Sequence, residues 1–109
     1  MKKYISLLIF IIAPFALIAQ NIKLEGVIRN EAGEPLEMAN VIAFKKGTKF
    51  LQSYSITDVK GNYRLSLEQN EAYTLKVSYL GFDTQDFEIT TNNTVNNFTK
   101  DVVLKESNE

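Results

Sequence analysis

The chain has 109 residues, with 12 basic residues against 13 acidic ones, no histidine and no cysteine. A nucleic-acid partner is disfavoured because it normally requires a basic face. The lack of histidine removes the usual general base near neutral pH and the Ser-His and Cys-His nucleophilic pairs. The lack of cysteine removes disulfides and the commonest zinc ligands. We therefore expect a protein that is not an enzyme, holds no cofactor or metal, and is stabilised by its core alone.

The first 19 residues have the three parts of a secretory signal peptide. Two lysines follow Met1, residues 4–18 are almost wholly apolar, and Ala19 is a small residue suited to cleavage. A membrane anchor is the competing interpretation, but the apolar run contains Pro14 and is shorter than the roughly 20 residues that span a bilayer as a helix. Without the two lysines, 10 basic residues stand against 13 acidic ones. We expect a mildly acidic mature chain without a membrane span.

After this segment, apolar residues recur at every second position, which is the period of a half-buried strand and not of a helix. In chain order, the predicted strands cover residues 22–28, 39–44, 50–56, 63–67, 73–79, 84–89 and 98–104. The segment 39–44 is the most uniformly apolar and is expected to be a central strand. Seven short strands at roughly ten-residue spacing predict one small two-sheet β-sandwich, with a small barrel as the alternative.

The segment 56–63 is the most informative of the connections. Asp58 can accept hydrogen bonds from the backbone N–H groups that follow it, and Gly61 can adopt the positive φ that closes a tight turn. This chemistry predicts a hairpin between the two flanking strands. An Asp and an Asn near a glycine also resemble part of a calcium loop. Calcium binds six to eight oxygens, however, and only one carboxylate is present here, so a turn without metal is favoured.

Two other groups of residues invite a functional interpretation. Asp83, Asp86 and Glu88 are close in sequence, and the last two share a strand face, but a solvated acidic strand is the favoured interpretation. Tyr79 and Phe82 flank Gly81 and could form an interaction surface that stacks on sugars or peptides. Packing of both rings over the end of the sandwich, with a bend at Gly81, is the favoured interpretation.

Five short motifs follow one another in an order and spacing that resemble the carboxypeptidase-regulatory-like family, from about Ile22 to Leu104. They are Glu25-Gly26-Val27-Ile28, Gly33-Glu34-Pro35-Leu36, Ala39-Asn40-Val41, Thr57-Asp58 with Gly61-Asn62-Tyr63, and Leu75-Lys76-Val77-Ser78-Tyr79-Leu80-Gly81-Phe82. The resemblance implies an all-β fold, a seven-stranded transthyretin-like sandwich with Greek-key connections over residues 20–105. The turn that serves as its fold signature comprises Thr57, Asp58, Gly61, Asn62 and Tyr63.

The resemblance also implies a location and two alternative functions. In secreted proteins of Gram-negative bacteria, such a domain is similar to the amino-terminal extension of TonB-dependent outer-membrane receptors, so residues 106–109 would be a tail or the start of a linker. The first hypothesis is a non-catalytic structural or interaction domain of such a transport receptor, with partners in the cell envelope or in the rest of the receptor. The alternative is a stand-alone periplasmic or surface module that binds a ligand such as carbohydrate. Whether the chain is a fragment or complete stays open.

Overall fold

The computed structural model describes residues 21–93 and 97–108, so the predicted signal peptide lies outside the described residues. The described part contains strands and no helix, and hence no helix long and apolar enough to cross a membrane. The strands are β1 (Ile22–Asn30), β2 (Asn40–Lys45), β3 (Leu51–Ile56), β4 (Asn62–Leu67), β5 (Ala72–Ser78), β6 (Gln85–Thr90), β7 (Asn97–Thr99) and β8 (Val102–Leu104).

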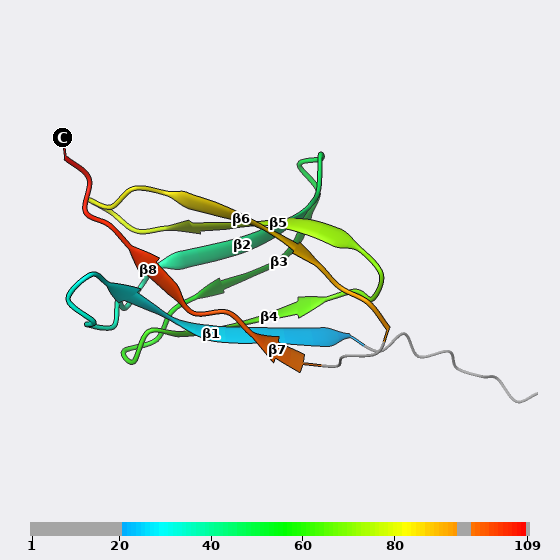
Figure 1. The fold of residues 1–109 in the computed structure, drawn as a ribbon, viewed down its shortest axis with the longest axis horizontal. Coiled ribbons are helices and arrows are strands. Elements are labelled where there is room, and N and C mark those ends of the chain that lie inside the picture. The colour runs from blue at the N-terminus through cyan, green and yellow to red at the C-terminus, as the bar shows by residue number, and fades with distance from the viewer. Residues whose placement is uncertain (1–20, 94–96, 109) are drawn as a thin grey trace, which may run out of the picture.

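These strands form two sheets that pack face to face, which confirms the predicted all-β sandwich (Figure 1). One sheet has the order β4-β1-β7, with β8 also paired to β1, and the other has the order β3-β2-β5-β6. The segment predicted to be a central strand is indeed central, since β2 lies between β3 and β5.

The core lies between the sheets and is built from alternate residues of each strand. In β4, Tyr63, Leu65 and Leu67 are buried while the residues between them are exposed. A buried aliphatic side chain stabilises the fold by roughly 1.5–3 kcal/mol relative to an exposed one. The largest fully buried side chains are those of Tyr73, Ile22, Leu24, Ile28, Leu65, Leu67, Leu75, Leu104, Val41 and Val77.

The described residues form eight strands and not seven, because the strand predicted at 98–104 is interrupted at Lys100 and Asp101. Both pieces, β7 and β8, pair in parallel with β1, and the offset between paired residues is the same on either side of the break. In an uninterrupted ladder of this register, the Val27 N–H would donate to the Lys100 carbonyl. It donates instead to Asp101 Oδ1, 2.9 Å away. A side chain has thus replaced a backbone acceptor.

The expected hairpin around the 56–63 turn is wrong, because β3 and β4 belong to different sheets. The two ends of the turn are held by different strands. Thr57 Oγ1 accepts a hydrogen bond from the Ala39 N–H at 2.8 Å, beside the start of β2. The Gly61 carbonyl accepts one from the Ile28 N–H of β1, also at 2.8 Å. The turn therefore carries the chain from one sheet to the other.

Strands β3 and β4 nevertheless lie beside each other along one side of the sandwich. Serine hydroxyls bridge them: Ser55 Oγ accepts from the Arg64 N–H at 3.3 Å, and Ser53 Oγ accepts from the Ser66 N–H at 3.1 Å. Both serines occupy inward-facing positions, since they pair with the buried Val41 and Ala43 of β2. Side-chain hydrogen bonds therefore close this seam where a hairpin would have used a backbone ladder.

Candidate functional site

The carboxylate of Asp58 organises the signature turn. Asp58 Oδ1 accepts hydrogen bonds from the N–H groups of Asn62 and Lys60, each at 2.9 Å, and its carbonyl accepts one from the Gly61 N–H at 2.8 Å. The bond from the Asn62 N–H is the largest of the effects that hold the pKa of Asp58 below its ordinary value. The carboxylate is therefore engaged by its own turn, as expected for an Asx-type connection.

Gly61 has a φ of 79°, the left-handed conformation expected at this position. A Cβ atom at Gly61 would lie 2.7 Å from the Ile28 carbonyl oxygen and 3.1 Å from Pro35 Cβ. Both the backbone conformation and the lack of space therefore require glycine. The turn packs tightly against β1 and the 31–36 loop, which gives it a structural role.

Tyr63 connects this turn to the break between β7 and β8. Its side chain is only 3% exposed, and its hydroxyl donates to the Lys100 carbonyl at 2.6 Å. A Cβ on Gly26 would overlap with that carbonyl and would lie 2.9 Å from the Tyr63 ring. Burial, followed by the negative charge of Asp101, raises the pKa of the Tyr63 phenol. The phenol is thus a neutral donor that fixes the C-terminal strands above Gly26.

The sequence identified Tyr63 and Gly26 as parts of motifs but missed Lys100 and Asp101, which complete this junction. One local signal was available. Gly26 occupies an inward position between Leu24 and Ile28, and a glycine inside a strand often marks a close approach of another backbone. The identity of the approaching segment could not be read from the sequence, because it lies more than 70 positions away.

A shallow open depression of about 650 Å³ lies beside the turn and over the outer face of β1 and β4. Two of its charged groups pair with each other: Arg64 Nε lies 2.8 Å from Glu25 Oε2. At its rim, Arg29 Nη1 lies 3.9 Å from Asp101 Oδ2. Such exposed pairs contribute about 0–1 kcal/mol each. In residues 21–93 and 97–108 there is no group of three or more acidic side chains arranged to hold a metal ion.

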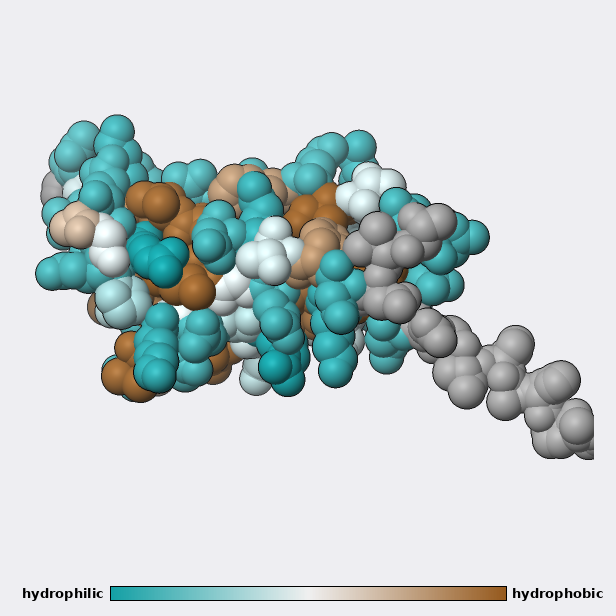
Figure 2. All heavy atoms as spheres, turned by 60° about the horizontal axis from the view of Figure 1, so that its bottom comes forward, coloured by the Kyte–Doolittle hydropathy of each residue, from teal (hydrophilic) through white to brown (hydrophobic). Residues whose placement is uncertain are grey.

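The face formed by the outer side of this sheet is largely hydrophilic. Figure 2, which brings the lower side of Figure 1 forward, shows mostly hydrophilic side chains with apolar ones in separate small areas. A carbohydrate-binding surface commonly uses exposed aromatic rings, and the tyrosine that lines the depression, Tyr63, is turned into the core. The depression therefore has polar groups but no stacking platform.

Tyr79 and Phe82, the predicted interaction surface, pack against each other and against the core. Their rings form an edge-to-face pair with centroids 5.3 Å apart, and both are partly buried. The segment after β8 runs beside this bend: the Asp83 N–H donates to the Lys105 carbonyl and the Ser107 N–H to the Gly81 carbonyl, both at 2.9 Å. This arrangement matches the favoured packing interpretation.

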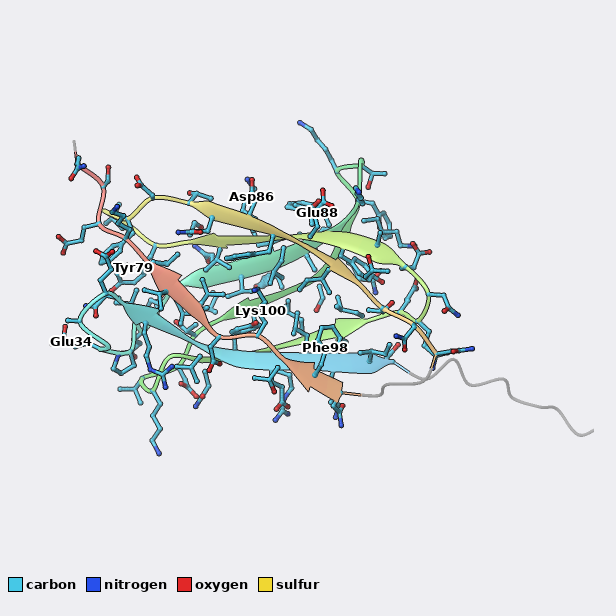
Figure 3. The ribbon with its side chains drawn as sticks, viewed as in Figure 1. Glu34, Tyr79, Asp86, Glu88, Phe98 and Lys100 are labelled. Atoms are coloured by element: carbon cyan, nitrogen blue, oxygen red, sulfur yellow. The ribbon has the colours of Figure 1, made fainter. Side chains whose placement is uncertain are left out.

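Leu80, between the two aromatic residues, is instead the side chain that faces solvent, at 96% exposure. Figure 3 shows Tyr79 at the end of the sandwich that also carries Glu34. Phe82, one of the two residues predicted to contact a ligand, instead forms a bridge with Glu106 of the protein's own C-terminal segment.

The carboxylates of β6 lie on the outer face of their sheet, where each meets a lysine. Asp86 Oδ1 is 3.4 Å from Lys76 Nζ, and Glu88 Oε1 is 3.1 Å from Lys46 Nζ. Asp86 and Glu88 point away from the sandwich in the same direction (Figure 3). Together they form a solvated acidic strand face, as was favoured from the sequence, and the structure adds a lysine partner for each.

The structure also exposes apolar side chains that the sequence analysis did not single out. Tyr54 of β3 is 59% exposed and lies opposite Ile42 of β2 on the outer face, and Met38 is 66% exposed. Met38 also has a positive φ of 74°, which is unfavourable for a residue with a long side chain. The weak alternation of apolar and polar residues in 50–56 was the available signal that Tyr54 is exposed. Nothing in the sequence predicted the conformation of Met38.

Comparison with known proteins supports the fold and indicates a family. The sequence profile of the carboxypeptidase regulatory-like domain matches residues 23–105. The TonB-dependent receptor SusC of Bacteroides thetaiotaomicron is 35% identical over 71 residues, which are 65% of this chain and 6% of the receptor. The chain thus spans only a small part of that relative's length.

Solved structures of enzymes share the fold at low sequence identity. Chlorocatechol 1,2-dioxygenase from Pseudomonas putida has a TM-score of 0.63 at 15% identity, over 84% of this chain and 63% of that one. Catechol 1,2-dioxygenase from Pseudomonas arvilla has the same TM-score at 14% identity, over 84% of this chain and 54% of that one. These likenesses show the fold alone.

Proposed function

The chain belongs to the carboxypeptidase regulatory-like domain family, and from this membership we propose that it is a non-catalytic structural or interaction domain of a TonB-dependent outer-membrane receptor. The observation that carries the proposal is the 35% identity to the receptor SusC over 71 residues. This match covers most of the sandwich. The domain would form the amino-terminal extension of the receptor, and it would be exposed to the periplasm after removal of a signal peptide.

The geometry of the described residues supports a non-catalytic role. The polar groups with functional potential are engaged locally: Asp58 by its own turn, Tyr63 by the Lys100 carbonyl, and Asp86 and Glu88 by lysines. General acid or base catalysis requires a titratable group that can reach a substrate proton in a pocket. The depression beside the turn offers paired surface charges instead.

The alternative, a stand-alone carbohydrate-binding module, depended on Tyr79 and Phe82 as a stacking surface. Both rings are partly buried against the core, and the segment after β8 bonds to the backbone of Gly81 and Asp83 beside them. No observation in the described residues favours this alternative over the receptor domain.

The test is to tag the protein at its native chromosomal locus and to fractionate the cell envelope. We expect the tag in the outer-membrane fraction, on a polypeptide far longer than 109 residues, with the frame continuing past Glu109 into the remaining receptor domains. A soluble periplasmic product that ends at Glu109 would overturn the proposal. If the receptor is found, deletion of residues 21–105 should leave its amount in the outer membrane unchanged and reduce uptake of its substrate.

A further inference from the structure

The first strand of the sandwich pairs with the last two, and all three run in the same direction. Residues 23–25 of β1 pair in parallel with β7, and residues 28–30 pair in parallel with β8. The chain therefore enters the sheet at one end of this pairing and leaves at the other, as Figure 1 shows. Tension on the segment beyond Ser107 would pull β7 and β8 lengthwise along β1, so their hydrogen bonds would be loaded together and not one after another.

We propose that this arrangement is a mechanical clamp, which resists tension applied between the two ends of the domain. The inference rests on the topology and the hydrogen bonds of the described residues. It goes beyond the proposed function, because it holds whatever partner the domain meets. The resistance would be directional: high along β1, and lower for forces that separate strands from one end.

The break between β7 and β8 does not interrupt the clamp. The Lys100 N–H donates to the Glu25 carbonyl and the Val27 N–H to Asp101 Oδ1, both at 2.9 Å, so the pairing with β1 continues through the break. The Tyr63 hydroxyl adds a bond from β4 to the Lys100 carbonyl at 2.6 Å. Sliding of the last strands therefore requires loss of contacts to two strands of the sheet.

The segment around and beyond β8 is also fastened to the opposite sheet. Glu106 forms a bridge with Phe82, in the connection between β5 and β6. Earlier in the same segment, Lys100 Nζ lies 4.4 Å from the centre of the Phe87 ring of β6. Tension arriving from the C-terminal side would meet the Glu106 bridge first and the β8–β1 pairing next. The last strands thus fasten the two sheets together on this side of the sandwich.

Single-molecule force spectroscopy on the full chain can test the direction dependence, because the sequence has no cysteine and attachment points can be chosen freely. Cysteines in place of Asn21 and Asn108 load the two ends. Cysteines in place of Asn21 and Gln69 pull β1 and β4 apart from the end where Ile22 pairs with Leu67. Since forced unfolding reports the unfolding barrier, we expect an end-to-end rupture force at least about twofold higher. Equal forces in the two geometries would overturn the proposal.

A matched pair of variants tests the role of Tyr63. Tyr63→Phe removes the bond to Lys100, whereas Tyr73→Phe removes a comparable bond from the Glu68 N–H to the Tyr73 hydroxyl, outside the clamp. We expect the end-to-end force to fall in Tyr63→Phe and to stay unchanged in Tyr73→Phe. Equal falls in both variants would mean that the force follows overall stability, which would contradict the clamp. If Tyr63→Phe does not fold, the comparison of pulling directions in the unsubstituted chain still decides.

Discussion

Tyr63 and Lys100 are joined by a 2.6 Å hydrogen bond from the phenol to a backbone carbonyl, and the bond passes over Gly26. The bond joins the signature turn, of which Tyr63 is the last residue, to the C-terminal strands. The Lys100 carbonyl bonds to Tyr63, and the Val27 N–H, which would face this carbonyl in an uninterrupted ladder, donates to Asp101 Oδ1. The last strand of the sandwich thus divides at the residue whose carbonyl is bonded to this hydroxyl.

Replacement of Tyr63 should lower the free energy of unfolding in two steps. Tyr63→Phe leaves the Lys100 carbonyl without its donor and should cost about 1–3 kcal/mol. Tyr63→Ala also empties a core position and should cost roughly 3–5 kcal/mol. Urea denaturation measures both values. Tyr54→Phe is the control, because Tyr54 is exposed and its change should stay within about 0.5 kcal/mol. A loss below about 1 kcal/mol for Tyr63→Ala would contradict a core role.

The alternation of apolar residues was sufficient to predict most strands and the sandwich class, because alternation follows directly from burial of one sheet face. Membership of the two sheets was not predictable in the same way. The hairpin expectation failed because β3 and β4 belong to different sheets. Hydroxyls of Ser53 and Ser55 bridge these strands and Thr57 bonds to the Ala39 N–H, and no local pattern reveals these contacts.

In the candidate site too, features set by neighbouring residues were predictable, whereas contacts between segments far apart in the sequence were not. Asp58 and Gly61 were identified correctly as turn residues, since their hydrogen bonds and conformation are local. Tyr79 and Phe82 were identified as aromatic residues beside a bend, but the segment that is hydrogen-bonded to this bend comes from residues 105–107. Packing between segments distant in sequence is decided by three-dimensional fit, and a single sequence does not specify it.

Two glycines with nearly equal φ provide a matched test of crowding at the turn. Gly61 and Gly33 have φ values of 79° and 86°, but a Cβ atom would meet the Ile28 carbonyl at 2.7 Å only at Gly61, whereas nothing lies within 4 Å at Gly33. Gly33→Ala should cost about 1–2 kcal/mol through the left-handed conformation alone. Gly61→Ala should cost clearly more, because the turn must also move away from β1.

Thermal or urea unfolding of the two alanine variants provides the comparison. If Gly61→Ala and Gly33→Ala lose the same stability, then the contact between the turn and the Ile28 carbonyl has no energetic role, and the interpretation of Gly61 as a packing requirement fails.

Acidification should destabilise the domain in part through Asp58. The pKa of Asp58 is lower in the folded state than its ordinary value, so this residue contributes stability that is present above the unfolded-state pKa of about 3.9 and is lost as the pH falls through the folded-state pKa. The variant Asp58→Asn keeps a side-chain oxygen that can accept hydrogen bonds but does not titrate. Its free energy of unfolding should therefore change less below about pH 4 than that of the unsubstituted chain.

The measurement is urea denaturation between neutral pH and the acid transition, with Glu31→Gln as a control for the loss of one exposed negative charge. A profile of Asp58→Asn that runs parallel to that of the unsubstituted chain through the acid range would contradict a titrating role for Asp58.

Met38 should be replaceable with a gain in stability. It has a positive φ of 74°, which costs about 1–2 kcal/mol for a residue with a Cβ atom, and its side chain is 66% exposed and so contributes little burial. Met38→Gly removes this strain but adds about 0.5–1 kcal/mol of backbone entropy loss on folding. We expect a net rise in the free energy of unfolding of up to about 1 kcal/mol, measured by urea denaturation.

Asn70→Gly is the control: Asn70 also has a positive φ, of 57°, but asparagine tolerates this conformation, so the gain there should be smaller. A loss of stability in Met38→Gly would show that the exposed Met38 side chain makes a stabilising contact that outweighs its strain.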